Sequence, residues 1–214
     1  MTKAWPSDQE LETKALDAAA RVFRRKGFAA ATVREIAESA GMLPGSLHYR
    51  FRSKEALLLR LVESAVDSLT VAISTALQDG GDDPVDRLRL ALRAHLRLLL
   101  SGDETVHALL YDARSLEGAP AAAMTRLRDR YERVWTTLLE DAARSGRLRP
   151  DIDLKLLRTF GFGAINGIAR SYLPSGNSKR RAVATDAVAD AAWSFIAHGI
   201  LDHQPRSRVR AVRG

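Results

Sequence analysis

The stretch TVREIAESAGMLPGSLHYRFRSKE, residues 32–55, carries the clearest structural signal in this chain. Thr32 is followed three residues later by Glu35, which is the pattern of a capping box at the start of a helix. In that arrangement each side chain accepts a hydrogen bond from the backbone N–H of the other residue. Gly41 then supplies a helix stop. The first part of the stretch therefore predicts a short helix over residues 33–40.

The rest of the stretch predicts a second short helix and the start of a third. Pro44 suits the first turn of a helix, because the missing N–H costs no hydrogen bond there. Leu47 and Phe51 are four residues apart, so they share one face and can anchor the helix to a core. Ser53 can cap the next helix. Two helices that are joined by a glycine turn and followed by a third indicate a helix-turn-helix, which places one helix in a DNA major groove.

Helical periodicity extends over almost the whole chain, and no segment has a convincing strand pattern. We predict an all-α fold of about nine helices, near residues 7–26, 33–40, 45–51, 54–78, 84–100, 103–114, 120–145, from 151 or 153 to 172, and 178–201. The segment 174–178 is expected to form a turn. We place a domain boundary within the fourth helix, near residue 60.

The net charge of +7 is concentrated at the two ends of the chain. Residues 1–60 contain 11 Lys and Arg against 7 Asp and Glu, whereas residues 61–202 contain 18 against 19. Residues 203–214 contain 4 against none, and we expect them to form a disordered basic tail that either adds non-specific DNA affinity or is solvated without a role in binding. A basic amino-terminal domain is what phosphate binding requires.

Composition excludes several other classes of protein. A chain of 214 residues that is 46% hydrophobic can bury a sizeable core. The absence of cysteine excludes disulfides, thiol catalysis and cysteine-ligated zinc, and it favours a reducing compartment. No apolar run approaches the length of a membrane span, and the polar amino terminus is unlike a signal peptide. We therefore expect a cytoplasmic protein without a membrane partner.

The helix-turn-helix stretch resembles the amino-terminal domain of TetR-family transcriptional repressors. The resemblance rests on Gly41, on SLHYRF at residues 46–51 and on SKE at residues 53–55. The chain departs from the family pattern at His48, where tyrosine is usual, and at Arg50, where histidine is usual. The resemblance implies an operator-binding homodimer with a helical DNA-binding domain over 1–60 and a ligand-binding and dimerisation domain over 61–202.

The same resemblance implies which residues meet DNA and which form the dimer. Base edges are assigned to Arg34, Pro44, Gly45 and His48, and phosphates to Thr32, Tyr49 and Lys54. The final helix is rich in small residues, which allow helices to approach closely, either on the monomer core or across a twofold axis. Because the last two helices of the family form a dimer interface, we assign to it Ala187, Val188, Ala191, Phe195 and Ile196.

The segment GFGAINGIARSYLPSG, residues 161–176, predicts a glycine-containing helix with two polar residues on one face. Asn166 and Arg170 are four residues apart beside an apolar stripe, so each needs a partner from the protein or from a ligand. The segment is similar to the carboxy-terminal domain of TetR-family repressors that sense acyl-CoA thioesters. That resemblance implies an acyl-CoA or related amphipathic acid as effector, held by Asn166 and Arg170. Four further candidates lie on helices expected to line the interior of the body, where such side chains belong either to the core or to the ligand site: Tyr111, Arg114, Tyr131 and Trp135.

Two other functions can be weighed against this interpretation. An enzyme would need catalytic residues in a recognisable pattern, and the chain lacks G-x-S-x-G, Walker and HExxH motifs. The five histidines lack the spacing of metal ligands, so we assign no catalytic residue, metal or cofactor. A constitutive architectural DNA-binding protein is the second alternative. Such a protein would not need a large helical body with neither excess charge nor a DNA-binding pattern.

Overall fold

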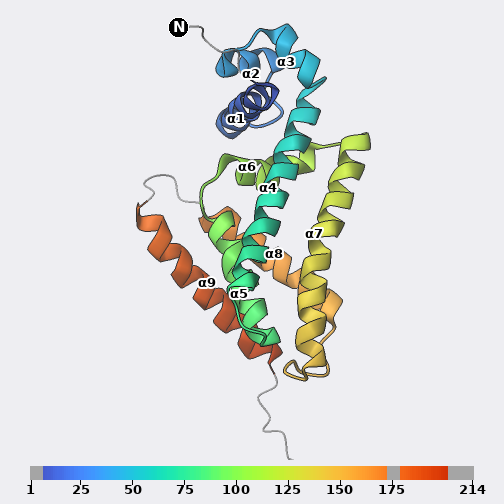
Figure 1. The fold of residues 1–214 in the computed structure, drawn as a ribbon, viewed down its shortest axis with the longest axis vertical. Coiled ribbons are helices and arrows are strands. Elements are labelled where there is room, and N and C mark those ends of the chain that lie inside the picture. The colour runs from blue at the N-terminus through green and yellow to red at the C-terminus, as the bar shows by residue number, and fades with distance from the viewer. Residues whose placement is uncertain (1–6, 173–178, 202–214) are drawn as a thin grey trace, which may run out of the picture.

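The computed structural model describes residues 7–172 and 179–201, with side chains in the last segment from residue 185 (Figure 1). The turn predicted at 174–178 and the tail predicted at 203–214 lie outside these residues. The described part contains nine α-helices, as predicted: α1 Asp8–Lys26, α2 Val33–Ala40, α3 Pro44–Arg50, α4 Lys54–Gln78, α5 Pro84–Leu99, α6 Glu104–His107, α7 Gly118–Arg144, α8 Leu154–Tyr172 and α9 Lys179–Ile200.

Helices α1 to α3 form a small unit at one end of the long axis of the molecule (Figure 1). The capping box is present, because Thr32 Oγ1 accepts from the Glu35 N–H and the Glu35 carboxylate accepts from the Thr32 N–H. Gly41 ends α2 in the left-handed conformation at φ 64°, which favours glycine. Leu47 is fully buried and Phe51 nearly so, so α3 is anchored as its sequence predicts.

Helix α4 connects this unit to the larger helical body (Figure 1). Ser53 caps it by accepting a hydrogen bond from the Ala56 N–H. Its buried face packs against α1 near its start and against α5 and α7 along its length. In the body, α9 packs against α5, and α8 packs mainly against α7. Of the two caps considered for α8, Asp153 accepts from the backbone of Lys155 and Leu156, whereas Asp151 pairs with Arg149.

The segment predicted as one helix over 103–114 is instead divided into three parts. Helix α6 ends at His107, a π-helical turn covers Ala108–Asp112, and a 3₁₀ turn covers Ala113–Ser115. Partners that are distant in sequence bind this segment: the Leu110 carbonyl accepts from the Arg170 guanidinium, and the Asp112 side chain accepts from the Phe28 N–H. Periodicity alone cannot reveal such tertiary contacts. Within the described ranges, no helix combines the length and apolarity that a membrane span needs.

Candidate DNA-binding surface and ligand cavity

The side chains of α3 form an exposed surface at the end of the molecule. Apart from the buried Leu47 and the half-buried Arg50, the residues of this helix are exposed, including Pro44, Gly45 and His48. Tyr49 is 88% exposed, which is unusual for a tyrosine without a binding partner. An exposed short helix held by one buried leucine is suited to enter a groove wide enough for a helix.

Two of the other predicted DNA contacts lie at the start of α2. Thr32 is exposed at the helix cap, and Arg34 is exposed in the first turn. Arg34 donates to Glu38 at 3.2 Å across one helical turn. A solvent-exposed pair of this kind is weak, so Arg34 can exchange Glu38 for a base or phosphate at little cost.

Lys54 is the predicted DNA contact whose ammonium group has internal partners. Its Nζ donates to the carbonyls of Phe28 at 3.0 Å, Ala29 at 3.1 Å and Ala31 at 3.4 Å, and it lies 4.6 Å from the centre of the Phe28 ring. An ammonium group has three N–H donors, so these carbonyls use all of them. The structure thus gives Lys54 an internal role, because it fixes the loop that leads into α2, and the phosphate contact stays a prediction.

Replacing Lys54 with alanine should therefore destabilise the protein. We expect the free energy of unfolding to fall by about 2 kcal/mol, because hydrogen bonds to a charged donor are lost and three carbonyls lose their partner. Chemical denaturation measures this. The exposed Arg52 is a neighbouring control, and Arg52→Ala should change stability by less than about 0.5 kcal/mol. If Lys54→Ala is as stable as the wild type and its DNA binding depends less on salt, the main role of Lys54 is a phosphate contact and not the internal one.

Arg50, the second departure from the family pattern, also has an internal partner. Its guanidinium donates to the Asp8 carboxylate at 2.5 Å and to the Asp8 carbonyl at 3.3 Å. These bonds connect the end of α3 to the start of α1. The arginine therefore helps to orient α3 within the domain.

A cavity of about 530 Å³ lies in the body between α8 and α9, and residues of α5 and α7 complete its lining. Its volume is within the range of small-molecule sites in proteins. The lining is mostly aliphatic and aromatic, and it includes Leu88, Leu92, Trp135, Leu139, Leu157, Phe160, Phe162, Ile165, Trp193, Phe195, Ile196 and Ile200. A pocket with this lining suits an apolar group of a ligand.

An aromatic cluster closes one side of the cavity. Phe162 and Trp135 belong to the lining. The His95 ring centre lies 5.5 Å from that of Trp135 and 6.1 Å from that of Phe162, and the Tyr131 ring centre lies 6.0 Å from that of Phe162. Burial lowers the pKa of His95 to about 3, so the imidazole is neutral at physiological pH. Its Nδ1 shares a hydrogen bond with the Tyr131 hydroxyl. This side of the cavity therefore carries no charge.

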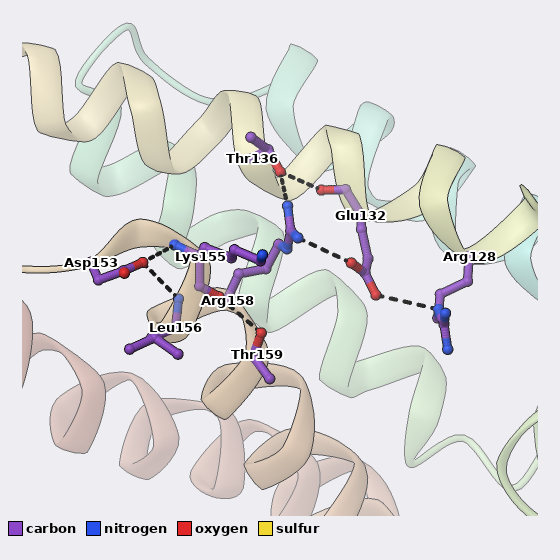
Figure 2. Close-up of polar contacts among 8 residues, drawn as sticks. All are labelled: Arg128, Glu132, Thr136, Asp153, Lys155, Leu156, Arg158 and Thr159. Carbon is purple, nitrogen blue, oxygen red and sulfur yellow. Dashed lines mark hydrogen bonds and ion pairs between the residues drawn. The ribbon is translucent and has the colours of Figure 1, made fainter. Parts of the chain in front are cut away.

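Charged side chains lie at another part of the cavity, near the start of α8 (Figure 2). Arg158 reaches from α8 to α7, where it donates to Thr136 Oγ1 and to Glu132 Oε2, the latter at 3.3 Å. Asp151 and Asp153 also belong to the lining, but Arg149 pairs with the first and the backbone of α8 holds the second. Arg158 was not singled out from the sequence, although this cation directly follows Leu157 and lies four residues before Phe162, beside the apolar stripe of α8.

Of the six residues predicted to bind ligand, Trp135 lines this cavity. Tyr131 is buried in the adjacent aromatic cluster, and Asn166 is half-buried on α8. Arg170 is exposed, and Arg114 is exposed in the 3₁₀ turn. The expectation of a buried residue at Arg170 is therefore corrected: the residue is exposed, and its guanidinium reaches the backbone carbonyl of the buried Leu110.

Arg170 and Tyr111 instead connect the end of α8 to the π-helical turn. The Arg170 guanidinium donates to the Leu110 carbonyl from Nε at 3.3 Å and from Nη2 at 3.2 Å. In the reverse direction, the Tyr111 hydroxyl donates to the Arg170 carbonyl at 3.0 Å. The ring of Tyr111 stacks on His107 with 4.5 Å between ring centres. Two residues of the predicted ligand site thus form a junction between two helical segments.

The π-helical turn also contacts the DNA-binding end of the chain. Asp112 Oδ1 accepts a hydrogen bond from the Phe28 N–H at 3.3 Å in a buried environment. Burial raises the pKa of this carboxyl group. Arg24 of α1 donates to the Gly102 carbonyl just before α6 at 3.1 Å. The loop that Lys54 fixes is therefore held from the body side as well.

The residues assigned to the dimer interface lie on α9, and several face outward. Ala187, Ala191 and Phe195 follow one another at four-residue spacing and are exposed, and Phe195 is 84% exposed. Val188 and Ile196 are half-buried and pack against the core. Phe160 of α8 is 71% exposed. Phe160 of α8 and Phe195 of α9 also line the cavity. The exposed apolar face formed by these two helices therefore includes the edge of the cavity.

A helix-turn-helix at one end and a hollow helical body at the other define a DNA-binding regulator. Residues 15–61 match the family described as bacterial regulatory proteins, tetR family, and residues 81–200 match the family described as Tetracyclin repressor-like, C-terminal domain. The chain belongs to the TetR family of bacterial transcriptional regulators. This assignment confirms the predicted family and all-α fold, and it confirms that the chain is a regulator rather than an enzyme.

Individual relatives agree with this assignment. The transcriptional repressor KstR2 of Mycolicibacterium smegmatis is 30% identical over 162 residues, which cover 75% of this chain and 78% of the relative. The regulator PfmR from Thermus thermophilus has a similar structure, with a TM-score of 0.73, 26% identity, and coverage of 86% and 97%. AibR, solved in complex with isovaleryl coenzyme A and operator DNA, has a TM-score of 0.74 at 23% identity, with coverage of 87% and 97%.

Proposed function

We propose that the protein is a homodimeric repressor that binds operator DNA and is released from it by a small amphipathic acid, as the free acid or as its coenzyme A thioester. The observation that carries the proposal is the apolar cavity of about 530 Å³ in a body joined by direct contacts to the helix-turn-helix. The AibR complex, with isovaleryl coenzyme A and operator DNA, supports the ligand class by analogy.

A second copy of the chain is the partner that fits the exposed face of α8 and α9. Phe160, Phe195, Ala187 and Ala191 give this face large apolar groups beside small ones, which allows helices to interlock closely. Exposure of this apolar face to water, including the two phenylalanine rings, is unfavourable. A twofold dimer would bury them and would present two α3 helices to successive half-sites on DNA.

Contacts along α8 suggest how a ligand in the cavity would change DNA binding. Phe160, Phe162 and Ile165 of the lining belong to α8, so a bound ligand moves or braces that helix. At the far end of α8, Arg170 would transmit the change to the π-helical turn and from there to the Phe28 loop. The ligand shifts the population of the DNA-binding form only by as much as it prefers the other form, typically by about 1–3 kcal/mol.

Replacing Arg170 with alanine should separate ligand binding from DNA release. Because Arg170 lies outside the cavity lining and far along the chain from α3, we expect the ligand and the operator each to bind within about threefold of wild type. The ligand should no longer weaken operator binding by the expected factor of about 5–150. Fluorescence anisotropy of labelled operator, titrated with acyl-CoAs and free acids, measures this coupling.

Arg114 provides the matched control, because it is an exposed arginine beside the same π-helical turn. Arg114→Ala should respond to ligand like the wild type. If Arg170→Ala also responds like the wild type, the proposed route through Leu110 is wrong. If Arg170→Ala fails to bind ligand at all, the arginine belongs to the ligand site, as the sequence resemblance implies.

A further inference from the structure

Arg158 is the basic side chain among the residues that line the cavity. It extends from the second turn of α8 toward α7, and its side chain is 23% exposed (Figure 2). Its Nη atoms contact Thr136 and Glu132, whereas its Nε is buried without a hydrogen-bond partner. A guanidinium can hold a carboxylate or phosphate through two parallel bonds. The single carboxylate contact of 3.3 Å in this structure leaves part of that capacity unused.

Glu132, the present partner of Arg158, has a second cation within reach. Arg128 lies one helical turn earlier on α7, and its Nε is 3.7 Å from Glu132 Oε1 (Figure 2). Glu132 can therefore release Arg158 without becoming an isolated charge. This matters because removing one member of a partly buried ion pair is costly when the other is left unpaired.

We propose that Arg158 binds the anionic group of the effector, which replaces Glu132 as its partner while the apolar part of the effector fills the cavity. The inference rests on the ligand-controlled function proposed above and names the residue and the exchange that select an anion. Because the Arg158–Glu132 pair connects α8 to α7, the exchange would also release α8 at this point.

The acidic residues of the lining do not favour a cationic ligand instead. Asp151 receives two bonds from Arg149, at 3.1 and 2.6 Å. Asp153 receives the Lys155 and Leu156 N–H groups at 2.8 and 3.0 Å (Figure 2). A ligand cation would have to displace these local partners, whereas a ligand anion displaces only Glu132, which keeps Arg128.

A series of compounds with the same ten-carbon chain tests the proposal. Decanoate and decanoyl-CoA are anionic, 1-decanol is neutral and decyltrimethylammonium is cationic. Binding to the full-length protein is measured below micelle-forming concentrations through the fluorescence of Trp135 and Trp193, both in the lining. The anions should bind most tightly. An effect of Arg158 on decanoate assigns a carboxylate, and an effect on decanoyl-CoA alone assigns the CoA phosphates.

Two substitutions should change anion affinity in opposite directions. Arg158→Gln should weaken binding of the anion about 10- to 100-fold and leave 1-decanol unchanged, because charge-assisted bonds are lost. Glu132→Gln should strengthen anion binding, because the competing carboxylate is removed. Arg130→Gln is the control: this exposed arginine of α7 pairs with Asp67 outside the cavity lining, so its loss should change anion affinity by less than about threefold.

The proposal is overturned if neither anion binds more tightly than 1-decanol, if the cation binds best, or if Arg158→Gln keeps the preference for anions. DNA release is measured separately with labelled operator. Anions that bind through Arg158 without releasing DNA would contradict induction and leave this site in place. If anions release DNA but bind Arg158→Gln as tightly as the wild type, induction is supported and the Arg158 site is rejected.

Discussion

Replacing Phe195 with glutamate should convert the protein into a monomer that binds its operator about 100-fold or more weakly. Phe195 is 84% exposed on α9, at four-residue spacing from Ala191. A carboxylate at this position of the proposed twofold interface would lose its hydration and face the same carboxylate of the second protomer. Loss of the dimer removes the second half-site contact, and linked binding of two sites commonly gains a factor of about 10²–10⁴.

Sedimentation velocity at micromolar concentration gives the oligomeric state, and anisotropy gives the affinity for DNA. Val71→Glu is the control, because Val71 is a similarly exposed apolar residue, at 64%, but lies on α4. This variant should stay dimeric and bind DNA normally. A wild-type protein that sediments as a monomer, or a Phe195→Glu variant that remains dimeric, would show that α8 and α9 do not form the interface.

Substitutions on the exposed face of α3 should separate sequence preference from general affinity. His48→Ala should change which base pairs are preferred, because a base-edge contact contributes about 1–3 kcal/mol of discrimination. Tyr49→Ala should weaken binding to all duplexes alike, because a phosphate contact carries no sequence information. Both residues are exposed beside the buried Leu47, so neither substitution should unfold the domain.

The measurement is binding-site selection from a random duplex library, followed by affinity titrations. Arg34→Ala should weaken specific binding, whereas Arg21→Ala on the exposed side of α1 provides a charge-matched control with a small effect. If His48→Ala and Tyr49→Ala both select the same sequences as the wild type with unchanged affinity, α3 is not the recognition helix.

Local sequence patterns were sufficient to predict the DNA-binding end. The Thr32–Glu35 capping box, the left-handed Gly41 and the buried Leu47 all depend on residues within a few positions of one another. Their energetics are local, so spacing alone reveals them. Some helix starts of the body were predictable for the same reason, since Pro84 and Asp153 act through the backbone of their own first turn, although Asp151 was an equal candidate in the sequence.

The partners of the two α8 arginines could not be predicted in this way, because residues distant in sequence decide them. Arg170 and Arg158 are both cations beside apolar stripes of α8, and sequence alone does not distinguish them. Folding brings the Leu110 carbonyl to Arg170, while Arg158 lies at the cavity beside Glu132. Lys54 shows the same limit: only the folded loop places three carbonyls around its ammonium group.

Selection of duplexes from a random library by the full-length protein, repeated with and without decanoyl-CoA, tests the central claim most directly. We predict an inverted repeat whose half-sites are about one helical turn of DNA apart, or a multiple of it, because the proposed dimer would relate its two α3 helices by a twofold axis. We also predict that the ligand sharply reduces recovery of that repeat. Recovery of no common sequence, or of a single unpaired site that is insensitive to acyl-CoAs and free acids alike, would contradict a ligand-controlled dimeric repressor.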